Sequence, residues 1–178
     1  MSTLASEIMT EEEKLVAELE LLGVRYLSRQ TTYQAHARRD PATLLADLIR
    51  QPSARVRGAM IAVLLAHPVF AEVIPSALER LEVAEQLTLK LFYMAAVLIQ
   101  QKHAERFRRF VASNWRWLPD LFSGELGLPF TGPPDDRLAA LGHAHARLTN
   151  TVLNWRGTYE SVAEHLLRRW ELERRWSR

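Results

Sequence analysis

The chain has 178 residues, of which 48% are hydrophobic and 25% are charged, and its formal net charge is +2. This length suits one domain that can bury a core of its own, and the composition excludes a largely disordered chain. Because no cysteine is present, disulfides, thiolate zinc sites and cysteine nucleophiles are excluded.

The start of the chain is acidic and the remainder is basic. Residues 1–20 contain six Glu and one Lys, a net charge of −5, so residues 21–178 carry +7. The same start lacks the basic and apolar regions of a signal peptide. The most apolar stretch, residues 87–99, is shorter than the roughly 20 residues that span a bilayer. We therefore expect a cytoplasmic protein with no membrane partner.

Helical spacing of apolar residues runs through the whole chain, and no alternating strand pattern is found. The first helix is predicted over residues 10–22, where Thr10 and Glu13 match a capping box. Gly23 is a natural end for this acidic helix. Residues 24–39 are rich in Arg, Gln and Thr, and we interpret them as a partly ordered connection.

Residues 40–67 are predicted to form two helices joined by a tight turn. Asp40 and Pro41 start the first helix, and Ser53 caps the second, which ends at about Ala66. The segment resembles a HEAT-type helical repeat, through Leu44, Leu45, Leu48, Ser53, Val56, Arg57, Ala59, Val63 and Leu64. The resemblance implies solenoid-like stacking of helix pairs. Since a stable solenoid needs about three repeats, we expect such stacking only at the centre of a compact bundle.

The remaining core helices are predicted within residues 69–113, so that the core helices span 40–113. A short helix is expected over 69–74, another from Pro75 to about Leu81, and a central helix over 84–101 that continues, bent, through Val111. The central helix has almost no polar face and must be surrounded by other elements. The predicted core consists of Met60, Val63, Leu64, Leu87, Leu91, Phe92, Ala95, Leu98 and Ile99.

A proline- and glycine-rich loop over residues 119–136 separates the core from the C-terminal helices, residues 136–176. Four Pro and three Gly exclude a regular element there. Asp135 or Asp136 is expected to cap a helix ending at about Leu153, and Gly157-Thr158 to separate it from a last helix over 159–176. The sequence thus predicts one all-α domain over residues 1–178, a single compact multi-helix bundle.

The first candidate site is a basic stripe. At 100° per residue Lys102, Arg106 and Arg109 fall on one helix face, opposite Phe107 and Phe110, and Arg116 extends the stripe if the helix continues. Trp115 and Trp117 lie next to it. Such a patch can bind a phosphate backbone or an acidic partner. The alternative is a solvated helix face above a packed aromatic core.

The second candidate site is the loop itself. Eighteen residues is long for a connection inside a compact helical domain. The loop carries five large apolar residues, which are Leu121, Phe122, Leu126, Leu128 and Phe130. Exposed loops seldom carry so much apolar surface. Either the loop packs across the helices as a lid, or it presents an interaction surface to a partner.

No catalytic, cofactor or metal site is predicted. His143 and His145 are two positions apart and point to different sides of a helix, and no glycine-rich phosphate loop is found. HEPN-type ribonucleases are all-helical and use an Arg followed by a His after four to six residues, a spacing that Arg137 and His143, and Arg29 and His36, resemble in part. An Arg-rich chain produces as many such pairs by chance.

Three functional hypotheses follow. The first is a non-enzymatic protein-interaction or regulatory subunit of a larger bacterial-type intracellular complex, acting through helix faces and the loop. The second is a small helical subunit that binds a nucleic-acid backbone through the basic stripe. The third is a HEPN-type ribonuclease. The sequence does not identify a partner, a pathway or an oligomeric state.

Overall fold

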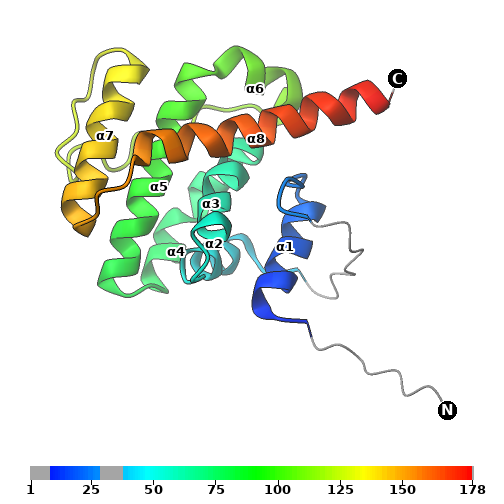
Figure 1. The fold of residues 1–178 in the computed structure, drawn as a ribbon, viewed down its shortest axis with the longest axis horizontal. Helices are drawn as coiled ribbons and strands as arrows, with labels where there is room; N and C mark the ends of the chain where they lie inside the picture. The colour runs from blue at the N-terminus through cyan, green and yellow to red at the C-terminus, as the bar shows by residue number, and fades with distance from the viewer. Residues whose placement is uncertain (1–8, 29–37, 178) are drawn as a thin grey trace.

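The protein is all-helical, as the sequence predicts. The computed structural model describes residues 9–28 and 38–177. Helices make up 71% of these residues, and no strand occurs among them. Figure 1 shows a bundle of helices crossed by the longest one, α8 (Trp155–Trp176), which runs from the side of α7 past α5 and α3 toward the C-terminus.

The N-terminal helix forms where the capping signal places it. Helix α1 (Glu11–Leu21) starts at Thr10, whose hydroxyl accepts a hydrogen bond from the Glu13 amide, while the Glu13 carboxylate accepts one from the Thr10 amide. Gly23 follows the helix with a φ of +83°, a conformation that favours glycine. The predicted end is therefore confirmed. Residues 29–37 of the predicted connection lie outside the described residues.

The helix pair predicted after Asp40 is confirmed. Asp40 caps α2 (Pro41–Ile49) and Ser53 caps α3 (Ala54–Ala66). The short helix expected over 69–74 is a 3-10 helix, η1 (Pro68–Val73), followed by α4 (Ile74–Glu79). Pro68 and Pro75 bracket a segment too short for a regular α-helix, and neither residue has an amide to donate.

The central helix is α5 (Val83–Lys102), and it bends into α6 (Ala104–Val111) at His103, as expected. A 3-10 turn, η2 (Ala112–Asn114), ends this unit. Among the described helices α5 is long and apolar enough to cross a membrane, and α3 with the bent η1–α4 segment passes the same test only jointly. Most of α5 is buried between α3, α7 and α8, which is typical of the core helix of a water-soluble protein.

The boundaries predicted for the C-terminal helices are partly wrong. Helix α7 (Pro134–Thr149) starts after Pro133, so Asp135 lies in its first turn, where a negative charge suits the helix dipole, instead of capping it. The helix ends before Asn150, which adopts the left-handed conformation with a φ of +51°. Thr149 rather than Leu153 is therefore the last helical residue.

Helix α8 also begins earlier than the sequence predicts. Asn154 caps it, because its side-chain oxygen accepts a hydrogen bond from the Gly157 amide at 3.0 Å. Gly157 and Thr158 consequently lie inside the first turn and separate nothing. A glycine near a helix start is tolerated when a stronger capping residue stands three positions before it.

The predicted core is confirmed with one exception. Eight of the nine residues are at most 3% exposed, and Leu87 alone is only partly buried. Leu87 lies in the second turn of α5, near Val83, which is exposed. The middle of α5 is enclosed on all sides, and its first turns extend beyond the packed layer.

We expect Leu91→Ala to destabilise the protein by ~2–5 kcal/mol, because Leu91 is fully buried on α5 and a cavity would remain. Chemical denaturation measures the change. Leu153→Ala, in the exposed α7–α8 connection, is the matched control and should change stability by less than ~0.5 kcal/mol. A loss below ~1 kcal/mol for Leu91→Ala would contradict the central position of α5.

Candidate interaction surface

Two of the four residues of the basic stripe, Lys102 and Arg106, form ion pairs with helices α7 and α8. The ammonium of Lys102 lies 2.6 Å from a Glu160 oxygen and 2.7 Å from an Asp135 oxygen. The Arg106 guanidinium lies 2.6 Å from Glu164 and 3.2 Å from Glu171. We call these four pairs the α8 seam. They place acidic side chains of α7 and α8 directly on the face that the sequence predicts for a partner.

The charges in the α8 seam stabilise one another. Hydrogen bonds to Asp135 and then Glu160 raise the pKa of Lys102, and the bond to Glu164 raises the pKa of Arg106. Conversely, the bond from Arg106 lowers the pKa of Glu164. These groups therefore stay charged at neutral pH, and the positive charge of Lys102 and Arg106 is neutralised within the chain.

Arg109 and Arg116, the other two stripe residues, lie apart from the α8 seam. Arg116 forms an exposed pair with Glu72 of η1 at 2.7 Å. Arg109 is exposed and has no ion pair within the described part of the chain. It borders a cleft of about 240 Å³ between α6 and α8, whose lining is Arg106, Arg109, Phe110, Glu171, Arg174 and Arg175. The predicted continuous stripe is therefore divided among separate environments.

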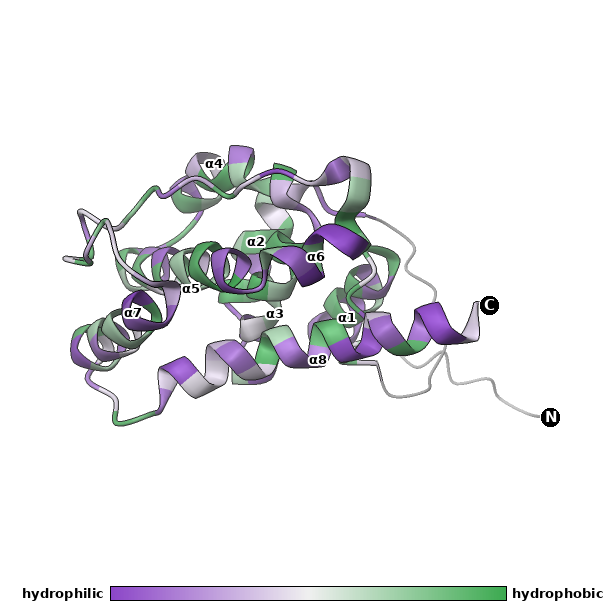
Figure 2. Ribbon diagram, turned by 90° about the horizontal axis from the view of Figure 1, so that it is seen from above, coloured by the Kyte–Doolittle hydropathy of each residue, from purple (hydrophilic) through white to green (hydrophobic). Residues whose placement is uncertain are grey.

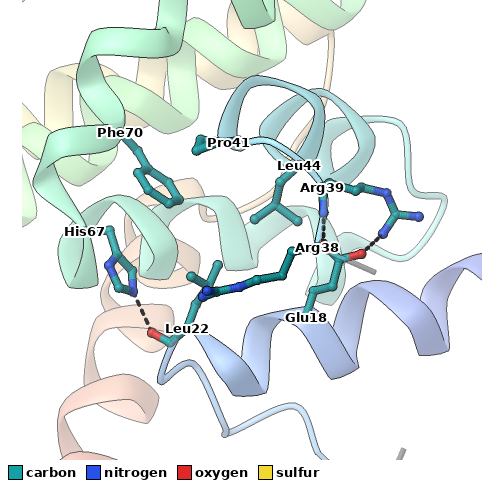
Figure 3. Close-up of a pocket in the computed structure, with 8 residues that line it drawn as sticks. All are labelled: Glu18, Leu22, Arg38, Arg39, Pro41, Leu44, His67 and Phe70. Carbon is teal, nitrogen blue, oxygen red and sulfur yellow. Dashed lines mark hydrogen bonds and ion pairs between the residues drawn. The ribbon is translucent and has the colours of Figure 1, made fainter. Parts of the chain in front are cut away.

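The acidic helix α1 does not cover the stripe. Its residues Glu11 and Glu18 both bind Arg39, at 2.7 and 2.5 Å, and Arg39 also reaches Asp47 of α2 at 2.9 Å. These contacts attach α1 beside a pocket of about 350 Å³, in which Arg38 extends over apolar walls formed by Leu22, Leu44, Pro41 and Phe70 (Figure 3). His67 also donates a hydrogen bond to the Leu22 carbonyl. The polar groups of this pocket thus serve to hold α1.

Side chains of α5 hold the start of the long loop. The fully buried Gln100 donates to the Arg116 carbonyl at 2.9 Å and accepts from the Leu118 amide at 2.8 Å. Two turns before Gln100 on α5, Tyr93 donates to the Pro119 carbonyl at 2.8 Å. These two hydrogen bonds fix the path of the chain, because a backbone carbonyl or amide that is buried without a hydrogen-bond partner destabilises the fold.

The end of the loop is held by a buried arginine of α7. Arg137 is 5% exposed and donates to the Pro129 carbonyl at 2.8 Å, to Asp120 at 2.8 Å and to the Ser123 hydroxyl at 3.0 Å. Burial alone would raise the pKa of Asp120, but bonds from Ser123 and Arg137 outweigh it and lower this pKa. The two halves of the loop are therefore joined through one side chain.

The loop both covers the core and exposes apolar side chains. Phe122, Leu126 and Leu128 are buried against the helices, as a lid would be. Leu121 and Phe130, by contrast, are 44% and 70% exposed. In Figure 2 the loop follows the side of the bundle from α6 toward the start of α7. The loop therefore covers the core as a lid would, while the interaction surface weighed as the alternative stays a prediction for its two exposed residues.

An exposed aromatic group lies next to the loop. The Arg108 guanidinium is 5.2 Å from the ring centres of both Trp115 and Trp117, and Trp117 is half exposed. Helical periodicity does not assign Arg108 to the basic stripe, and Trp117 lies outside the loop. The contact between Arg108 and Trp117 could therefore not be predicted from the sequence. We define the loop surface as the exposed side chains that follow one another along the loop, which are Arg108 and Trp117 near its start, Leu121, and Phe130 near its end.

The histidine and arginine of the ribonuclease spacing do not form a site. Arg137 is buried in the contacts described above, whereas His143 is exposed on another side of α7. Arg29 and His36 lie outside the described residues. Within the described ranges no group of three His, Asp or Glu side chains could hold a metal ion. Comparison with protein-family models, with curated proteins and with solved structures finds no match to this chain.

We expect Arg106→Gln and Arg109→Gln to differ in their effect on folding. Arg106→Gln removes two contacts to α8 and should cost about 1 kcal/mol, whereas Arg109→Gln should stay within ~0.5 kcal/mol of the parent protein. Urea denaturation at low and high salt measures both, and added salt should reduce only the first effect. Equal effects of the two changes would contradict the α8 seam.

Proposed function

We propose that the protein is a non-enzymatic protein-interaction subunit that binds a partner through the loop surface. The observation that carries the proposal is the rigid support beneath exposed apolar side chains. Leu121 lies between Pro119 and Ser123, and Phe130 follows Pro129, and these supporting residues are bonded to Tyr93 or Arg137. A long loop that served only to connect helices would need no such support for exposed phenyl and leucyl groups.

Two physical arguments favour a protein as the partner. First, a surface that is already ordered avoids the entropy cost of ordering a loop on binding. Second, the loop surface combines Trp, Arg and Phe, and Trp and Arg are the residue types that carry much of the binding energy at protein interfaces. Arg108 lies over both rings of the Trp115–Trp117 pair, and these two contacts orient its charge.

The proposal includes three further expectations from the sequence, which concern the HEAT-like stacking, the cellular location and the role in a complex. Helices α2 and α3 would represent the HEAT-like pair, with α5 stacked on α3 as the element that follows. The complex would be intracellular, and the protein cytoplasmic. Its role would be to assemble or regulate a larger complex, without a cofactor of its own.

We expect Phe130→Ser to abolish co-purification of the native partner while folding is unchanged, because Phe130 is exposed and its removal leaves no cavity. The measurement is capture of the protein from its native host, identification of the retained partner, and titration of the two purified proteins. Val152→Ser, a fully exposed apolar residue in the α7–α8 connection, is the matched control. Retention of the partner by Phe130→Ser at unchanged affinity would contradict the loop surface.

A nucleic-acid backbone is the second candidate partner, and the cleft between α6 and α8 favours it. Arg109, Arg174 and Arg175 border this cleft and have no ion pair within the described chain, and Arg174 lies 5.7 Å from the Phe110 ring. These three guanidinium groups can each contact a phosphate, because Glu171, the carboxylate in the lining of the cleft, is paired with Arg106.

For this second candidate the salt dependence of binding is the test. Arg109→Gln with Arg174→Gln should weaken binding for all sequences and reduce the slope of log affinity against log salt by about 1.4 to 1.8. Arg147→Gln, exposed on α7, is the control. Absence of nucleic-acid binding at low salt, or a slope unaffected by the double change, would exclude this function.

A further inference from the structure

A pocket of about 390 Å³ is lined by none of the residues of the loop surface. It forms where the α2–α3 turn meets the first turns of α5, the end of α7 and the start of α8. Its lining consists of Ile49, Arg50, Gln51, Pro52, Arg57, Ala84, Glu85, Thr88, Phe92, His145, Thr149, Thr151 and Trp155. Five elements distant in sequence therefore contribute to one pocket.

The pocket contains a histidine held in a fixed orientation. His145 is 2% exposed, and its ring stacks on Trp155 with the ring centres 3.5 Å apart and the planes 6° from parallel. Phe92 contacts the same ring edge to face at 5.6 Å. The indole of Trp155 is itself fixed by a hydrogen bond from its Nε1 to the Thr151 hydroxyl at 2.8 Å.

The hydrogen bond to Tyr159 determines which nitrogen of His145 carries the proton. His145 Nδ1 lies 2.5 Å from the Tyr159 hydroxyl, and Tyr159 is fully buried with no other hydrogen-bond partner in the described structure. Burial lowers the pKa of His145 to about 4, so the ring is neutral at pH 7. Because a buried hydroxyl proton needs an acceptor, Tyr159 donates to Nδ1, and the ring proton is on Nε2.

The Nε2–H group is the donor of His145 that has no partner. No hydrogen bond to Nε2 occurs among the described residues. The hydroxyl of Tyr26 is the one side-chain polar atom in that part of the chain that is completely enclosed and unpartnered. Nε2 therefore keeps some access to solvent, and the residue that carries it lines the pocket.

A positive charge lies in the same pocket. Arg57 donates to the carbonyls of Gln51 and Pro52 at 2.7 and 2.8 Å through a single nitrogen, Nη1. It forms no ion pair with a carboxylate within the described ranges, so its other nitrogens and its charge remain available. Arg50 also lines the pocket, but it is paired with Asp47 at 3.3 Å and lies 3.8 Å from Glu85.

We infer that this pocket binds a small organic anion, whose carboxylate or phosphate accepts hydrogen bonds from Arg57 and from His145 Nε2. The apolar part of the ligand would lie against Ile49, Pro52 and Phe92. The two donors are fixed before binding, Arg57 by backbone carbonyls and His145 by Trp155 and Tyr159. Glu85 does not oppose the anion strongly, since its carboxylate accepts the Glu82 amide and faces Arg50.

The five tryptophans of the chain allow a direct test by the NMR signals of their indole N–H groups. Trp155 lines the pocket, whereas Trp117 and Trp176 are exposed elsewhere and report non-specific binding. The probes are benzoate, phenyl phosphate, inorganic phosphate and the neutral benzyl alcohol. We expect a saturable shift of the Trp155 signal with benzoate or phenyl phosphate. The probe with the higher affinity identifies the preferred anionic group, carboxylate or phosphate. Benzyl alcohol and inorganic phosphate should each bind about tenfold more weakly or worse.

Variants distinguish the site from surface attraction. Arg57→Gln should weaken binding of the anionic probe about tenfold or more, and Thr88→Phe should block the pocket without removing a contact between elements, since Thr88 bonds only to Ala84 of its own helix. The control is Arg55→Gln, which removes an equal charge from α3. Because the Arg55 side chain contacts the Tyr26 carbonyl, this change should leave affinity unchanged. Equal binding of benzyl alcohol, equal shifts of all five indoles, or no saturable shift with any probe would overturn the proposal. Unchanged affinity in both Arg57→Gln and Thr88→Phe would do the same.

Discussion

The burial of α5 is the constraint on which the other elements depend. From Leu91 to Gln100 every residue of this helix is buried, so this part of the helix must be enclosed along its whole circumference. Helices α3, α7 and α8 cover most of it. The remaining side has no helix, and the long loop covers it, which explains why a segment rich in proline and glycine carries buried Phe122, Leu126 and Leu128. Two buried polar residues of α5, Gln100 and Tyr93, bond to the backbone just before and at the start of the loop, because a buried backbone needs partners that helices would otherwise supply.

The distribution of charge follows from the path of α8. This helix crosses the ends of α5 and α6, so its glutamates meet Lys102 and Arg106 over a separation of 58 residues or more. Arginines without an ion pair in the described chain include Arg109, Arg174 and Arg175, which border the cleft between α6 and α8, and Arg57 on α3. Neither the net charge nor the spacing of a helical stripe predicts which arginines stay unpaired, because this depends on which carboxylates pack against which arginines in the fold.

Local signals predicted the helices well, and long-range contacts account for most of what they missed. Thr10, Asp40 and Ser53 act within three or four residues, so their capping roles could be predicted from sequence. The start of α8 was misplaced because Gly157 and Thr158 are typical boundary residues, and only the observed bond from Gly157 identifies Asn154 as the cap. For the candidate sites, spacing identified the stripe and the apolar loop residues. It could not show that α8 neutralises Lys102 and Arg106, or that His145, Trp155 and Arg57 share a pocket, since these depend on packing between distant segments.

Helix α8 also contacts the beginning of the described chain, where Trp170 donates to the Gly23 carbonyl at 2.9 Å and Glu173 pairs with Arg25 at 3.0 Å. These contacts join residues separated by about 147 positions. During translation α8 is made after every other described helix, so the contacts cannot form before it is synthesised. Contacts of such high sequence separation form late and slow the folding of a domain that is otherwise rich in local helical contacts. Until α8 leaves the ribosome, the apolar faces of α3 and α5 that it covers remain open to water and to chaperones. Among the described helices, α8 is therefore the one whose synthesis allows the apolar faces of α3 and α5 to be covered.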